Sequence, residues 1–255
     1  MTHRSIDPRV HIFDSSNAVA ESIAQQWLDL SKRETIVNIS LSGGSTPKHV
    51  FIFIAHSDFA SQIVWKHLHF WWGDERCVSP THEQSNYGEA MRLLFSHVLI
   101  PADNLHPIHG ELSPEKACIE FKDEMEACLP MSAASGKSRP IYDWVILGVG
   151  DDGHTASLFP ENTNYEASQN AVLAYHPKTK QARVSLSAPG VCTAKRVTYL
   201  ALGEGKNKIV AAILNNEPSA EGLPAANIKS IQGLTEWYLD KHSASGLNQT
   251  LKASS

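Results

Sequence analysis

The chain of 255 residues has few cysteines, no excess of basic charge and no long apolar run. The four cysteines form no C-x-x-C pair and match no zinc or disulfide framework, which favours reduced thiols. Lys and Arg total 22 against 27 Asp and Glu, so the net charge of −5 provides no basic field for nucleic acid. The longest apolar run, residues 50–55, is too short to span a membrane, and residues 1–13 hold no run of signal-peptide length. We therefore expect a cytoplasmic protein that contacts neither nucleic acid nor a membrane.

Metal and nucleophile motifs are missing as well. The two close histidine pairs, His67/His69 and His106/His109, have no Cys or carboxylate partners at metal-ligand spacing, so we predict no metal site. A Gly-x-Ser-x-Gly nucleophile turn is absent. The composition, 42% hydrophobic and 19% charged, is that of an ordinary globular protein.

Strand and helix patterns alternate along most of the chain. Runs typical of strands cover 10–13, 35–41, 68–72, 142–147, 183–187 and 197–202, and helical patterns cover 15–32, 47–55, 86–98, 113–128, 206–215 and 234–242. This alternation predicts an α/β, Rossmann-like fold with a mainly parallel sheet covered by helices on both faces. We predict one domain over residues 1–242, with a small subdomain around 155–195, where the pattern is least regular, as the alternative. We also predict a loop over 131–140 and a frayed or disordered tail over 243–255.

Four glycine-bearing turns follow predicted strands and deliver polar residues. In an open α/β sheet, ligands bind in the crevice outside the carboxyl ends of the strands, so these turns are expected to meet around one site. The turns are Ser42-Gly43-Gly44-Ser45-Thr46-Pro47, Gly73-Asp74-Glu75-Arg76, Gly148-Val149-Gly150-Asp151-Asp152-Gly153-His154 and Gly203-Glu204-Gly205-Lys206.

The first and last of these turns suit a phosphate group. Residues 42–46 provide bare backbone, small hydroxyl side chains and the start of a helix, all of which favour an anion. The turn is not a P-loop, because no Lys follows at the required place, and an ordinary capped βα turn is the alternative. Lys206 lies where it can reach the same anion, although by itself it is more typical of a solvated surface lysine. Arg76 and Arg183 are further candidate cations, although each alone is more typical of a surface ion pair than of a ligand contact.

The turn over residues 148–154 carries the candidate chemistry. His154 is a suitable general base near neutral pH, and Asp152, two residues earlier, can orient its ring. The alternative is a Gly/Asp turn with a histidine cap. The Gly-x-Gly-x-x-Gly spacing does not indicate a dinucleotide site, because two carboxylates in the turn would repel a pyrophosphate. Asp74, in another turn, is either a turn cap or a polar contact for a substrate.

With these residues in view, the chain resembles the 6-phosphogluconolactonases over roughly residues 10–240. The resemblance rests on 42–47, on 72–76 with Ser85-Asn86-Tyr87, on 223–225 and 237–240, and above all on the long stretch 147–160, which ends Leu158-Phe159-Pro160. It implies a deaminase/phosphogluconolactonase-like fold and hydrolysis of 6-phospho-D-glucono-1,5-lactone, with a sugar-phosphate lactone as small-molecule partner and without cofactor or metal.

The resemblance also implies roles for individual residues. His154 activates a water molecule, Asp152 orients His154, and Asp74 contacts sugar hydroxyls. The phosphate is held by the turn residues and three cations: Ser42, Gly43, Gly44, Ser45 and Thr46 with Lys206, Arg76 and Arg183. The related glucosamine-6-phosphate deaminases carry a glutamate where Phe159 stands here, which argues against ring opening. A non-catalytic sugar-phosphate sensor is the other alternative, but the chain has no basic helix-turn-helix pattern. The oligomeric state is left open, and a monomer is compatible with the sequence.

Overall fold

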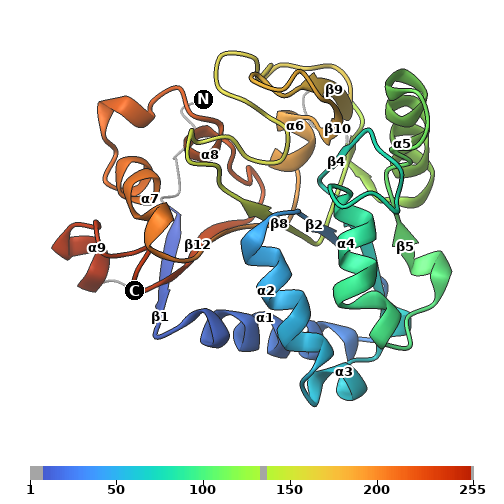
Figure 1. The fold of residues 1–255 in the computed structure, drawn as a ribbon, viewed down its shortest axis with the longest axis horizontal. Helices are drawn as coiled ribbons and strands as arrows, with labels where there is room; N and C mark the ends of the chain where they lie inside the picture. The colour runs from blue at the N-terminus through green and yellow to red at the C-terminus, as the bar shows by residue number, and fades with distance from the viewer. Residues whose placement is uncertain (1–7, 133–136, 254–255) are drawn as a thin grey trace.

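A parallel seven-stranded sheet forms the centre of the computed structural model, which describes residues 8–132 and 137–253 (Figure 1). The strands lie in the order β1-β12-β11-β8-β2-β3-β5, and every neighbouring pair is parallel. Helices flank the sheet, so the predicted α/β fold class is confirmed. The strand bounds are β1 (Arg9–Phe13), β2 (Val37–Leu41), β3 (Leu68–Trp72), β5 (Leu105–His106), β8 (Trp144–Gly148), β11 (Arg196–Ala201) and β12 (Leu234–Asp240).

Serine side chains cap the N-termini of several helices. The hydroxyl oxygens of Ser15, Ser85 and Ser113 each accept a hydrogen bond from the backbone N–H three residues later. Within the described ranges, no helix is long and apolar enough to cross a bilayer. The helices are α1 (Ser16–Ser31), α2 (Ser45–Ala55), α3 (Phe59–Gln62), α4 (Asn86–Leu93), α5 (Pro114–Cys128), α6 (Ala188–Cys192), α7 (Asn207–Leu214), α8 (Pro224–Asn227) and α9 (Gln249–Ala253).

A second, antiparallel sheet stands beside the main one, in the order β4-β10-β9. Its strands are β4 (Asp74–Arg76), β9 (Ala171–Tyr175) and β10 (Ala182–Leu186). The chain passes from β3 into β4 at Gly73, whose carbonyl accepts a hydrogen bond from Leu186 N at 2.8 Å. The β4–β10 register places Arg183 opposite Arg76, although the two residues are far apart in sequence.

Two segments, residues 234–240 and residues 131–140, differ from the sequence-based expectation. Residues 234–240 form β12 rather than the expected helix, because the segment lies between β1 and β11 and is buried along almost its whole length. A strand buried on both faces shows no apolar alternation, so its sequence resembles a short apolar helix. The expected loop over 131–140 contains a short pair, β6 (Met131–Ser132) with β7 (Arg139–Pro140), and residues 133–136 lie outside the described part.

The segment after β12 is packed rather than frayed. Ser243 and Ala244 are buried, and Ser243 N donates to Asp240 Oδ1 at 2.8 Å. Leu247 is also buried, and α9 follows. For residues 243–247 the expected fraying is not seen, because the Asp240 carboxylate and the buried apolar side chains hold this stretch; residues 254–255 lie outside the described part.

The strand order defines where a ligand site is expected. From β2 the chain continues outward to β3 and β5, whereas β8, β11 and β12 lie on the other side of β2. The direction of winding therefore reverses between β2 and β8, and the carboxyl ends of these two strands flank the crevice that such a switch point creates.

Candidate active site

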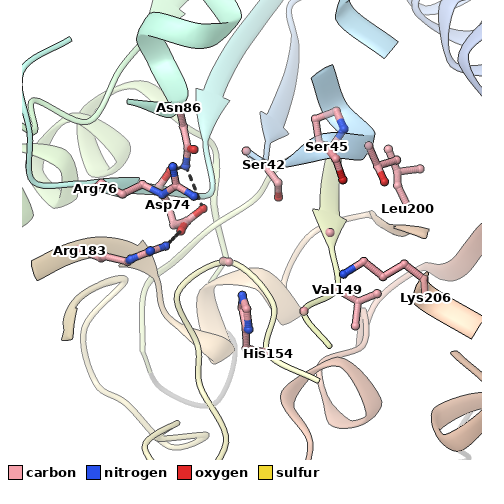
Figure 2. A pocket seen from close by; sticks show the side chains of 17 residues that line it. Ser42, Ser45, Asp74, Arg76, Asn86, Val149, His154, Arg183, Leu200 and Lys206 are labelled. Atoms are coloured by element: carbon pink, nitrogen blue, oxygen red, sulfur yellow. Dashed lines mark hydrogen bonds and ion pairs between the residues drawn. The ribbon is translucent and has the colours of Figure 1, made fainter. Parts of the chain in front are cut away.

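A cavity of about 210 Å³ lies at the switch point between β2 and β8 (Figure 2). Every site residue predicted from the sequence lines it except Asp152, which stands behind His154. The lining residues are Ser42, Gly43, Gly44, Ser45, Thr46, Pro47, Asp74, Arg76, Asn86, Gly148, Val149, Gly150, His154, Ala156, Arg183, Leu200 and Lys206.

The loop over residues 42–46 presents the N-terminus of α2 to the cavity. Gly44 precedes the helix with φ of 111°, and neither a side-chain cap nor an acidic residue in the first turn compensates the positive end of the helix. The Ser42 hydroxyl donates to the Ile146 carbonyl at 2.8 Å and ties this loop to β8. The loop therefore has the backbone arrangement of an anion-binding helix N-terminus.

Gly43 has to be a glycine because of its neighbour Asn86. A Cβ atom at position 43 would lie 1.9 Å from Asn86 Oδ1. Asn86 Nδ2 in turn donates to the backbone carbonyl of Asp74 at 2.8 Å. Asn86 is thus wedged between the two turns that follow β2 and β3. Asn86 is not among the site residues predicted from the sequence, because an asparagine beside a helix cap carries no signal that it faces a loop about forty residues away.

One wall of the cavity combines the buried carboxylate of Asp74 with two arginines. Ser157 Oγ donates to Asp74 Oδ2 at 2.6 Å, and Arg183 Nη1 lies 3.9 Å from the same oxygen. Arg76 Nη1 donates to the Gln84 carbonyl at 2.6 Å. Burial lowers the pKa of Arg183, but a guanidinium titrates so high that it remains a cation.

The arginines retain unused hydrogen-bonding capacity. The Nε atoms of Arg76 and Arg183 are both buried, and within the described part of the chain neither has a hydrogen-bond partner. Like charges that face each other across paired strands repel, so this arrangement is costly unless an anion compensates it. The wall is therefore suited to a negatively charged ligand.

His154 and Asp152 form a hydrogen-bonded pair within a closed turn. The distance between His154 Nδ1 and Asp152 Oδ1 is 2.5 Å, and His154 N donates to the same oxygen at 3.1 Å. Because an ionised carboxylate only accepts, Nδ1 carries the proton and Nε2 is left as the basic nitrogen. Burial alone would raise the pKa of Asp152, but the hydrogen bonds from His154 outweigh it and hold this pKa below its ordinary value.

The geometry of the turn fixes the imidazole. Gly153 N donates to Gly150 O at 2.9 Å, and Gly150 N donates to His154 O at 2.8 Å. A Cβ at position 150 would lie 2.1 Å from His154 Nδ1, so only glycine allows the ring its place. Phe159 packs against the other side, with ring centroids 5.1 Å apart. The pair thus has the geometry that an oriented general base requires, and it lies at the edge of the cavity.

Lys206 approaches the cavity from the side opposite to the arginines. It ends a short 3-10 helix, Glu204–Lys206, just after β11. Figure 2 shows its amine extended toward the turn of Val149 and His154, across the cavity from Arg76 and Arg183. Its Nζ lies 2.6 Å from Asp151 Oδ1. The predicted cations therefore line one cavity but are divided between two walls.

In the described ranges, no three His, Cys, Asp or Glu side chains gather so as to hold a metal ion.

Ser157, like Asn86, was not predicted as a site residue. Its contact with Asp74 forms only when the segment after His154 folds back onto Asp74. Glu75 was not predicted as a site residue either; it is almost completely buried behind the arginine wall and accepts backbone N–H groups of α4.

A parallel α/β sheet with a cavity of about 210 Å³ at its switch point places the protein among the α/β proteins that bind a small ligand at the carboxyl ends of the strands. The family model described as glucosamine-6-phosphate isomerases/6-phosphogluconolactonase matches residues 13–237, and the chain belongs to this family. The resemblance inferred from the motifs is therefore confirmed.

The chain is also similar to individual members of this family and to solved structures. A 6-phosphogluconolactonase of Haemophilus influenzae is 46% identical over 229 residues, which are 90% of this chain and 95% of the relative. The crystal structure of the devB protein is 48% identical with a TM-score of 0.89, and the match covers 94% of this chain and 99% of that one. The 6-phosphogluconolactonase of Trypanosoma brucei is 25% identical with a TM-score of 0.81, over 96% of this chain and all of that one.

Proposed function

We propose that this protein hydrolyses 6-phospho-D-glucono-1,5-lactone to 6-phospho-D-gluconate, a reaction of the oxidative pentose phosphate pathway. The observation that carries the proposal is the oriented Asp152–His154 pair at the edge of a cavity whose other walls are cationic or formed by a helix N-terminus. The relatives named 6-phosphogluconolactonase, at 46% identity over most of the chain, support the same substrate.

The phosphate of the substrate binds at the loop over residues 42–46. The backbone N–H groups at the start of α2 and the helix dipole favour the anion, and Lys206 supplies a cation from the same cavity. Arg76 and Arg183 are cationic partners from the opposite wall, where they also offset the negative charge of a substrate that carries a phosphate. Asp74, fixed by Ser157, accepts hydrogen bonds from sugar hydroxyls.

The chemical step is direct attack by water on the lactone carbonyl. His154 Nε2 takes a proton from the water as its oxygen bonds to C1, and a tetrahedral oxyanion forms. When the oxyanion collapses, the bond between C1 and the ring oxygen breaks, and the ring oxygen receives the proton from His154. Asp152 holds the imidazole in the reactive tautomer and stabilises its protonated form. General-base catalysis of this kind contributes about 10²- to 10⁴-fold, and positioning supplies the rest.

Amino-sugar deamination is the less suitable chemistry for this site. The residue in contact with the imidazole is Phe159, which is 2% exposed and has no carboxylate to support ring opening. The structural likeness to a monomeric glucosamine-6-phosphate deaminase, at 16% identity, concerns the fold alone.

The decisive experiment compares lactonase rates of the wild type and His154→Ala on freshly generated lactone, after subtraction of the uncatalysed hydrolysis. We expect the variant to lose about 10²- to 10⁴-fold in kcat. His176→Ala is the matched control, because His176 also packs against Phe159, at 5.4 Å between ring centroids, but does not line the cavity. A wild type that does not exceed the background rate would refute the proposed function, whereas a fully active His154→Ala would refute only the general base.

A further inference from the structure

Asp151 holds Lys206 at the rim of the cavity. The carboxylate of Asp151 lies 2.6 Å from Lys206 Nζ, its side chain is 81% exposed, and the lysine side chain is 24% exposed. Lys206 lines the cavity and Asp151 does not. Lys206, a cation that lines the cavity together with the N-terminus of α2, is thus engaged from outside the cavity by a carboxylate that the proposed reaction does not use.

Asp151 can release Lys206 without disturbing the catalytic turn. Asp151 and Asp152 occupy the middle of the turn that Gly153 N closes onto Gly150 O, and Gly150 N is bonded to His154 O. These bonds are between backbone atoms, so the position of Asp151 does not depend on its ion pair. The side chain of Asp152 points to His154 and is independent of Lys206 as well.

An exposed ion pair of this kind is weak, and a phosphate at the cavity would displace it. Exposed pairs contribute little because water screens them and two side chains lose freedom. A phosphate offers Lys206 a larger negative charge and is itself stabilised by the N-terminus of α2. When the phosphate is bound, Asp151 has lost its partner Lys206, and its negative charge lies close to the negative charge of the phosphate.

We propose that Asp151 is an affinity-determining residue that competes with the substrate phosphate for Lys206 and so weakens the retention of phosphorylated ligands. This inference rests on the proposed function, because it takes Lys206 to be a phosphate ligand. The phosphate is present in both substrate and product, so a phosphate site without a competing carboxylate would bind both tightly. Tight binding would delay the release of the product, which has gained a carboxylate. Asp151 limits this uniform binding.

The test is the dissociation constant of 6-phosphogluconate, measured by titration calorimetry with the wild type, Asp151→Asn and Lys206→Met. We expect Asp151→Asn to bind about two- to fivefold more tightly than the wild type, the range that an exposed ion pair represents. The gain should shrink as salt is added, because the competing pair is exposed and screened. Gluconate, which has no phosphate, should show no difference between the wild type and Asp151→Asn.

Glu204→Gln is the matched control. It removes one negative charge from the turn that carries Lys206, and within the described part of the chain Glu204 forms no ion pair. Tighter binding by Glu204→Gln equal to that of Asp151→Asn would show a diffuse charge effect and overturn the inference. Weaker binding by Asp151→Asn would overturn it too, because Asp151 would then position Lys206 for the phosphate.

Lys206→Met distinguishes the role of Lys206 as a phosphate ligand from the competition by Asp151. If it weakens binding of 6-phosphogluconate while Asp151→Asn leaves binding unchanged, the phosphate site stands and the competition by Asp151 is refuted. If Lys206→Met leaves binding unchanged, Lys206 is no phosphate ligand, and both that part of the proposed function and the inference about Asp151 fail.

Discussion

Single residues shape the site as much by the side chains they lack as by those they carry. Position 43 has no room for a Cβ because Asn86 Oδ1 occupies the space, and position 150 has none because the His154 ring does. These two glycines differ from Gly205, where a Cβ would meet no other atom within 4 Å. Glycine is therefore required where it lets a functional side chain approach the backbone, and not at every turn.

Gly43→Ala should impair catalysis. The added methyl group displaces Asn86 and with it the carbonyl and carboxylate of Asp74, and a misplacement near 1 Å can reduce the rate about a hundredfold. We expect kcat/KM for the lactone to fall by roughly that factor. Gly205→Ala, in the turn beside Lys206, should keep the wild-type value. Equal activity of both variants would show that the Asn86 wedge is unimportant.

At the scale of elements, Asp240 joins three segments at the end of β12. Its carboxylate accepts hydrogen bonds from Gly203 N after β11, from Ser243 N in the following segment and from Ser16 Oγ at the start of α1. Burial alone would raise the pKa of Asp240, but these hydrogen bonds outweigh it and lower the pKa. The ionised form is thus part of the folded structure.

Asp240→Ala should destabilise the protein, because it leaves buried donors without an acceptor. We expect the free energy of unfolding in urea at pH 7 to fall by roughly 2–3 kcal/mol. Because the folded pKa is depressed, this stabilisation is present above the ordinary pKa of an aspartate and disappears as the pH falls through the folded value. Asp29→Ala, an exposed site on α1, should change stability by less than about 0.5 kcal/mol. An equal loss in both variants would contradict the prediction.

For the whole molecule, Glu75 connects the small sheet to the layer of helices on the main sheet. It lies on β4, is 2% exposed, and accepts hydrogen bonds from the backbone N–H groups of Arg76, Asn86 and Tyr87. Burial raises its pKa to about 7; the backbone hydrogen bonds oppose this shift, and the neighbouring Asp74 adds to it. Global stability should therefore depend on pH in a range where most carboxylates no longer titrate.

The difference in unfolding free energy between the wild type and Glu75→Gln should change between about pH 4.5 and pH 7. A raised folded pKa means that the folded state retains a proton that the unfolded state has lost. The contribution of Glu75 is therefore complete below its unfolded pKa and is lost as the pH rises through about 7. We expect a relative decline of the wild type on the order of 2–3 kcal/mol over this range. Urea unfolding at several pH values measures it, with the exposed Glu120→Gln as control; a flat difference would contradict the raised pKa.

Much of the architecture could be predicted because its signals are local. Serine caps, apolar strand runs and glycine turns lie within a few residues of the elements they define, and the strands β1, β2, β3, β8 and β11 lie where the patterns indicate. The three-residue strand β4, Asp-Glu-Arg, carries no such pattern, because it owes its existence to pairing with β10. The apolar run of β9 was not among the predicted strands. β12 resembles a helix in sequence for the related reason that burial on both faces removes the alternation.

In the candidate site, too, some features follow from local sequence and others only from tertiary structure. The sequence alone determined which chemical groups are available: a hydroxyl- and glycine-rich turn before a helix, an Asp-x-His turn, and cations after strands, since turn chemistry is read from neighbouring residues. Only the tertiary structure decided which groups meet. It paired Arg183 with Arg76, wedged Asn86 against Gly43 and set Asp151 on Lys206, because strand order and register bring together residues that no local pattern relates.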